Sequence, residues 1–103
     1  MNRVIGLDSI SKAIPVSDLR SVVLLDRLGQ EALYGLMECA RNVFLIDDAG
    51  SVVWQVSSDF DSDGDPFTNI FMEGGQLKAY RWDGGSYSVD VQTGRAVPDQ
   101  LLK

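Results

Sequence analysis

The stretch EGGQLKAYRWDGGSYSVDV, residues 73–91, contains two Gly-Gly pairs separated by segments in which apolar and polar residues alternate. Glycine readily adopts the positive φ angles that two-residue hairpin turns need, so the pairs at 74–75 and 84–85 predict such turns. Alternation with a period of two, cleanest over 87–91, is typical of a strand with one buried face. The stretch therefore predicts antiparallel strands joined by two tight hairpins.

The residues before this stretch continue the pattern of strands and turns. FTNIFM (67–72) predicts one strand, and NVFLI (42–46), a continuous apolar run, predicts another that is covered on both faces. Between them VVWQV (52–56) alternates, so its first and last valines and its tryptophan should share one face. Together with 76–82 and 87–91, these segments predict an antiparallel meander of five strands.

The N-terminal part of the chain is less regular. SVVLL (21–25) predicts a further strand, and RVIGL (3–7) is a second candidate. Over about 30–40, apolar residues recur at helical spacing and predict one short helix, although Gly35 costs it roughly 1 kcal/mol relative to alanine. We expect a single domain over 1–103 of mainly β (α+β) class: an antiparallel β-meander of five or more strands with one short helix in the N-terminal half.

The composition is that of an ordinary globular protein with an acidic charge. The chain is 45% hydrophobic and 23% charged, and its net charge is −6. No apolar run reaches the ~18 residues of a membrane span, and the single Cys39 cannot form an internal disulfide. We expect no secretory leader, because residues 1–16 contain no sustained apolar run. We therefore expect a cytoplasmic protein. Its negative charge argues against nucleic acid and membrane surfaces as partners.

Several residue types that catalytic sites need are missing. The chain has no histidine, which removes the commonest general base and both the Ser-His-Asp and Cys-His nucleophile systems. One cysteine without histidine leaves no usual zinc site, and no glycine-rich loop precedes a helix as a phosphate-binding loop must. We expect no enzymatic activity, no cofactor and no metal site.

The segment DFDSDGDPF (59–67) places four aspartates at alternate positions. Counted from Asp59, it matches positions 1, 3, 5, 6 and 7 of an EF-hand calcium loop. It then departs from that pattern, because Pro66 occupies position 8 and Ile70 occupies position 12, where a bidentate glutamate is needed. The flanks predict strands and not helices. We expect an exposed loop between strands, and a calcium-binding β module remains an alternative.

The acidic charge is concentrated in the middle of the sequence. Seven acidic residues and no basic one lie between Arg41 and Lys78. Aspartates crowded over 59–65 repel one another, and a cation or a basic protein would offset that cost. The segment therefore favours a basic protein partner.

Aromatic residues form a second candidate feature. In the strand over 76–82, Tyr80 and Trp82 fall on the face opposite Leu77, Ala79 and Arg81. With Trp54 and Tyr87 from other strands, they are candidates for one aromatic cluster, and aromatic residues ringed by charge are frequent at protein interfaces. The candidate partner-binding residues are Asp47, Asp48, Asp59, Asp61, Asp63, Asp65, Tyr80 and Trp82.

Two stretches resemble a widespread set of small bacterial proteins: NVFLIDDAGSVVWQV (42–56) and LKAYRWDGGSYSVDVQTGRA (77–96). Some of these proteins look like the immunity proteins that accompany polymorphic or contact-dependent growth-inhibition toxins. The resemblance implies a small, acidic, cytoplasmic and non-enzymatic protein that neutralises a cognate toxin domain by direct binding. Many such toxins are nucleases with basic active sites, which an acidic segment can occupy by imitating a phosphate backbone. A structural or assembly subunit remains a further alternative.

Overall fold

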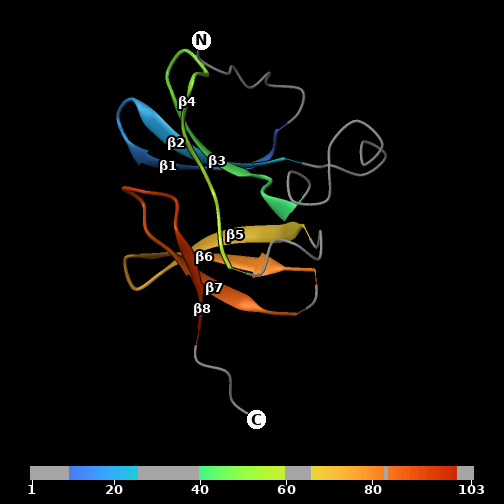
Figure 1. Cartoon of the computed structure of the whole chain (residues 1–103). Helices are drawn as coiled ribbons and strands as arrows, with labels where there is room; N and C mark the ends of the chain where they lie inside the picture. The colour runs from blue at the N-terminus through green and yellow to red at the C-terminus, as the bar shows by residue number, and fades with distance from the viewer. Residues whose placement is uncertain (1–9, 26–39, 60–65, 83, 100–103) are drawn as a thin grey trace, which may run out of the picture.

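A computed structural model describes residues 10–25, 40–59, 66–82 and 84–99, and within these ranges the chain forms two four-stranded antiparallel sheets (Figure 1). In each sheet, strands that follow one another in sequence are neighbours, so each sheet is a meander. The first sheet contains β1 (Ile10–Ser17), β2 (Arg20–Leu25), β3 (Val43–Asp47) and β4 (Val52–Gln55). The second contains β5 (Phe67–Glu73), β6 (Gln76–Arg81), β7 (Ser86–Val89) and β8 (Ala96–Pro98).

The turn between β5 and β6 has the geometry that its glycine pair predicts. Glu73 pairs with Gln76, so the loop between the strands is two residues long. Gly74 and Gly75 have φ angles of 59° and 82°. Both lie in the left-handed region that a two-residue hairpin with the native strand twist requires, and glycine reaches that region without steric cost.

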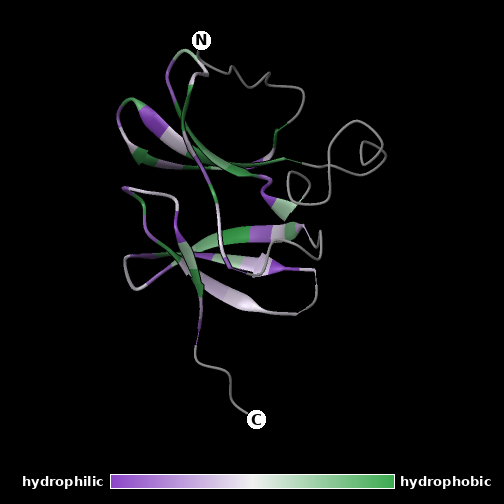
Figure 2. Ribbon diagram, viewed as in Figure 1, coloured by the Kyte–Doolittle hydropathy of each residue, from purple (hydrophilic) through white to green (hydrophobic). Residues whose placement is uncertain are grey.

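The two sheets pack face to face over a shared apolar core, and hydrophobic residues line strands of both (Figures 1 and 2). Burial of these side chains is the main favourable term that holds the layers together. The first sheet contributes Val22, Leu24, Val43, Leu45 and Trp54, followed by Val56, and the second contributes Phe67, Ile70, Leu77, Ala79, Tyr87, Val89 and Ala96.

The opposite face of the first sheet carries a second buried cluster. It consists of Val23, Leu25, Phe44 and Ile46, with Phe44 fully buried. Because consecutive side chains of a strand point to opposite faces, β3 contributes alternate residues to the two clusters. The prediction that the apolar run at 42–46 forms a strand covered on both faces is confirmed.

The predicted alternation over 52–56 is wrong at its start. Val52 packs against the second cluster, whereas Trp54 and Val56 belong to the shared core. The pairing of β3 with β4 shifts by one residue, because Ile46 pairs with Val52 and Leu45 pairs with Trp54. Val53 is the extra residue of this β-bulge, and an extra residue reverses the faces of the side chains before it.

The predicted single meander is also corrected, because the five strands belong to two sheets. The chain leaves the first sheet after Val56, whose N–H still donates to the carbonyl of Val43 (2.8 Å). Ser57 then lies beside the second sheet, where it donates to Gly94 (3.1 Å) and accepts from Ala96 (2.8 Å). Two stacked sheets bury apolar faces that one open sheet would leave exposed.

The strand at 21–25 is confirmed as part of β2, whereas β1 and β8 were not predicted. Most side chains of β1 are exposed and show no alternation, and β8 has only three residues and ends at Pro98. The predicted helix over about 30–40 lies almost entirely outside the described residues, which contain no helix element, and is not confirmed. The candidate strand at 3–7 also lies outside them.

Candidate interaction surface

The side chain of Asn42 joins the two sheets at the start of β5. Its Nδ2 donates to the carbonyl oxygens of Leu25 (2.9 Å) and Phe67 (2.8 Å), and its Oδ1 accepts from the N–H of Phe67 (2.8 Å). The side chain is 1% exposed, so these bonds satisfy an amide that would otherwise be buried at a cost. Asn42 therefore fixes the point where the acidic segment ends and β5 begins.

Arg81 is buried in the core although it carries a charge. Its side chain is 1% exposed, and its guanidinium lies 4.1 Å from the ring centroid of Phe67 and 4.9 Å from that of Tyr87. Nη1 donates to the hydroxyls of Ser58 and Tyr87 (3.3 Å each), and Nη2 donates to the carbonyl of Ala40 (3.1 Å). A planar group with several donors can satisfy partners from several segments at once.

These contacts hold both ends of the acidic segment. Ser58 directly precedes residues 59–65, and Phe67 follows them after one residue. Arg81 contacts both, and its backbone pairs with that of Phe67. The buried arginine therefore positions the segment's ends against β6.

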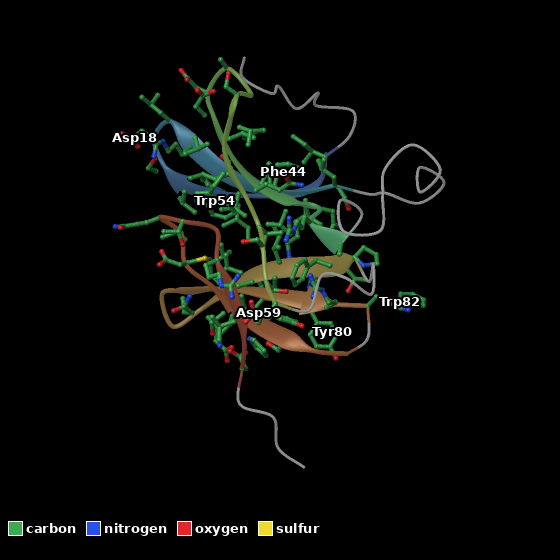
Figure 3. The ribbon with its side chains drawn as sticks, viewed as in Figure 1. Asp18, Phe44, Trp54, Asp59, Tyr80 and Trp82 are labelled. Atoms are coloured by element: carbon green, nitrogen blue, oxygen red, sulfur yellow. The ribbon has the colours of Figure 1, made fainter. Side chains whose placement is uncertain are left out.

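Tyr80 and Trp82 are exposed on the side of β6 that faces away from the core. Tyr80 is 44% exposed and Trp82 is 72% exposed, and Trp82 extends away from the ribbon in Figure 3. The buried residues of β6 are Leu77, Ala79 and Arg81, as the alternation predicts. The backbone N–H of Trp82 donates to the carbonyl of Pro66 (2.9 Å). Trp82 therefore lies beside the residue that directly follows segment 59–65.

The other two aromatic residues do not join this pair, which corrects the expected four-residue cluster. Trp54 is 8% exposed and lies between the sheets (Figure 3), where its Nε1 donates to the carbonyl of Val91 (2.7 Å). Tyr87 is 4% exposed and makes an edge-to-face contact with Phe67, with 5.4 Å between ring centroids. Tyr87 pairs with Ala79, so it shares the buried side of the sheet and not the side of Tyr80.

Asp59 forms an ion pair that the sequence did not indicate. Nη2 of Arg95 lies 2.5 Å from Oδ1 of Asp59, and both side chains are largely exposed. Arg95 follows the β7–β8 turn, 36 residues further along the chain, and only the fold brings it to Asp59. The other predicted loop residues, Asp61, Asp63 and Asp65, lie outside the described residues.

Asp47 and Asp48 occupy the β3–β4 turn. Oδ1 of Asp47 accepts from the backbone N–H groups of Ala49 and Ser51 (2.9 Å each), so this carboxylate stabilises its own turn. Asp48 is exposed. Figure 1 shows this turn at the end of the first sheet that lies away from the second, so the structure does not bring these residues together with Tyr80 and Trp82.

The outer side of the second sheet also carries a hydrogen-bonded ion pair. Nζ of Lys78 lies 3.1 Å from both carboxylate oxygens of Asp99, and the Asp99 oxygens also accept from the hydroxyls of Ser88 (2.6 Å) and Ser86 (2.8 Å). The Ser88 hydrogen bond is the main factor that lowers the pKa of Asp99; the Ser86 and Lys78 contacts add to it, and burial opposes them. This cluster holds the residue after β8 against β7.

The described residues show neither a metal site nor a membrane span. In the part of the chain that the structure describes, no three His, Cys, Asp or Glu side chains are grouped so that they could hold an ion. No helix there is long and apolar enough to cross a membrane.

The fold and this surface define a small two-sheet β domain with an exposed Tyr–Trp pair beside an acidic segment. The chain belongs to the family described as "Domain of unknown function (DUF7957)", whose match covers residues 2–101. No curated protein and no solved structure matches the chain.

Proposed function

We propose that the protein is an immunity-type binding protein that neutralises a cognate, basic toxin domain by direct contact. The contact surface consists of the acidic segment 59–65 together with Tyr80 and Trp82. The observation that carries the proposal is the backbone hydrogen bond from Trp82 to Pro66, because it places a residue that is 72% exposed beside the residue that directly follows segment 59–65. Large exposed aromatic side chains are the residues that most often anchor protein interfaces.

The charge of the chain supports a basic partner. The net charge is −6, and residues 59–65 contain four aspartates and no basic residue. Such a field steers a positively charged surface towards the protein and repels nucleic acid. A nuclease toxin presents a basic surface where it binds its own substrate, so the acidic segment would cover that surface and exclude the substrate.

The arrangement also supports inhibition by contact rather than by chemistry. Lys78 is held by Asp99, and the Arg81 guanidinium is buried at the contact between the sheets. Asp47 and Asp48 lie in the β3–β4 turn, at the end of the first sheet away from the second, so the proposed interface does not include them.

The test is co-expression in a bacterial host with the toxin domain encoded beside this protein's gene. The unchanged protein should restore growth, and Trp82→Ala and the double change Asp61→Asn/Asp63→Asn should each reduce the protection. The pair Asp18→Asn/Asp48→Asn is the matched control, because it removes the same charge from the first sheet's turns. Equal loss of protection in both pairs would remove the segment's specific role, and no protection by the unchanged protein would refute the proposal.

A further inference from the structure

An open depression of about 420 Å³ lies in the second sheet, at the end where the β5–β6 turn approaches the β7–β8 turn. Its lining includes Gln76, Ser88, Asp90, Arg95 and Val97. Tyr80 and Trp82 do not line it. The depression is therefore a surface feature separate from the exposed aromatic pair.

The depression opens on the side of the sheet that faces away from the core. Gln76, Ser88 and Val97 alternate along their strands with the buried residues Leu77, Val89 and Ala96. Side chains that alternate with core residues point to the opposite face of a sheet. Tyr80 belongs to the same outer face, since it alternates with Ala79 and Arg81.

The charge at the depression is negative once its ion pair is taken into account. Arg95, the cation of the lining, is bound by Asp59. Asp90 is exposed, and among the described residues its carboxylate accepts one hydrogen bond, from the N–H of Gln92 to Oδ1 (2.8 Å). Glu73 is also exposed, at the adjoining β5–β6 turn. Neither carboxylate forms an ion pair with a described cation.

Two apolar side chains line the depression beside Asp90. Val91 is 40% exposed and Val97 is 55% exposed, which is a large fraction for valine in a sheet protein. A carboxylate next to exposed methyl groups suits a long basic side chain, because lysine and arginine lay their methylene stems on apolar surface and direct the charged head to a polar group.

We propose that this depression takes one lysine or arginine side chain of a bound basic protein, with its charged head at Asp90 and its stem across Val91 and Val97. The inference rests on the proposed function, because the side chain belongs to the toxin domain that Tyr80 and Trp82 contact on the same outer face. Nucleic acid and anionic lipid are excluded by charge. A second copy of this acidic chain is disfavoured in the same way, since its net charge is also −6.

The probe is a fluorescent octa-arginine peptide, with octa-glutamate as the peptide of reversed charge, and binding is followed by anisotropy at about 0.15 M salt. Val97→Arg places an arginine side chain of the protein in the depression, where it would occupy the space and repel a peptide cation. This change should weaken octa-arginine binding about tenfold. Leu19→Arg is the matched control, because it makes the same change from apolar residue to arginine in the β1–β2 turn, where Leu19 is 61% exposed. It should weaken binding by less than about twofold, through net charge alone.

A second measurement locates the peptide. In amide NMR spectra of the labelled protein, octa-arginine should shift the signals of Gln76 and of residues 88–91 and 95–97, and leave those of the β1–β2 turn unchanged. Asp90→Asn, which keeps the oxygen that accepts from Gln92, should reduce these shifts without unfolding the β7–β8 turn.

Equal weakening by Val97→Arg and Leu19→Arg, or peptide-induced shifts that avoid 88–91, would overturn the assignment, as would the absence of octa-arginine binding. The peptide assay needs no toxin, so its failure is distinguishable from failure of the growth assay. If Val97→Arg abolishes peptide binding yet the unchanged protein gives no protection, the depression is a basic side-chain site and the proposed function is wrong.

Discussion

The indole N–H of Trp54, in the first sheet, donates to the carbonyl oxygen of Val91, in the β7–β8 turn of the second, across 2.7 Å. The same indole closes over Gly94, where an added Cβ would lie 2.5 Å from its Cε3 atom. Trp54 thus both donates a hydrogen bond to the β7–β8 turn and packs against it. This contact joins the two sheets next to the proposed basic side-chain site.

Gly94→Ala should therefore destabilise the fold strongly. The φ of Gly94 is 80°, which strains any residue with a Cβ, and the new methyl group also collides with the Trp54 ring. We expect a loss of about 3 kcal/mol in the free energy of unfolding, measured with urea. Gly74→Ala is the matched control, because φ is again positive but nothing lies within 4 Å, so it should cost only about 1 kcal/mol. Equal losses in the two variants would show that the Trp54 contact is unimportant.

Arg81→Met should also destabilise the protein. Methionine keeps much of the packing against Phe67 and Tyr87 but removes the donors that reach Ser58 and the carbonyl of Ala40. Buried acceptors that lose their donors cost about 2–4 kcal/mol in all, which thermal and urea unfolding would detect. Arg20→Met, at an exposed position of β2, is the control and should change stability by less than about 0.5 kcal/mol. A stable Arg81→Met variant would contradict the assigned positioning role.

A comparison of β6 with the β-bulge in β4 shows which features the sequence alone predicts. The alternation in β6 and the glycine pair before it depend on neighbours in the chain, so the strand, the turn and the face of Tyr80 were predictable. That Trp54 and Tyr87 are buried apart from Tyr80 and Trp82 was not, because it depends on the packing of the two sheets. The bulge at Val53 was not, because it is defined by pairing with another strand.

The ion pairs of the site also escaped prediction. Asp59 and Arg95 are 36 residues apart, and Lys78 and Asp99 are 21 apart, and no periodicity or turn chemistry relates such positions. The alternation put Arg81 on the face of Leu77, but a charged residue gives no local signal that the second layer will bury it. The sequence therefore identified the acidic segment but not Arg95, the cation of the same chain that pairs with Asp59.

Asp99 should give the protein a pH-dependent stability at the acidic end. Its pKa is lowered in the folded protein from the ordinary 3.8, so the carboxylate contributes stability above that value and loses it as the pH falls through the lower folded pKa. Asp99→Asn should be less stable than the unchanged protein by on the order of 1 kcal/mol at pH 7. The difference should shrink below pH 4 in urea titrations at several pH values. A difference that stays constant down to pH 2 would show that the charge of Asp99 has no role.

Calcium should have little effect on the protein. The segment at 59–65 lacks the bidentate glutamate of an EF-hand loop, and the first of its four aspartates is bound by Arg95. We expect calorimetry to give no binding heat and thermal unfolding to show no shift when Ca²⁺ replaces Mg²⁺. A Ca²⁺-specific rise in melting temperature would favour the alternative of a calcium-binding β module.

Arg95→Gln tests whether the internal counter-ion competes with a basic partner. The Asp59–Arg95 pair is exposed, and such pairs contribute less than about 1 kcal/mol, so the fold should keep its stability. Without Arg95, Asp59 and the lining of the depression become more negative, and octa-arginine should bind several-fold more tightly than to the unchanged protein. Arg20→Gln removes the same charge from the first sheet and serves as the control for net charge. If both variants strengthen binding equally, Arg95 acts only through net charge; if Arg95→Gln weakens binding, the arginine itself contacts the partner, and the proposed competition is wrong.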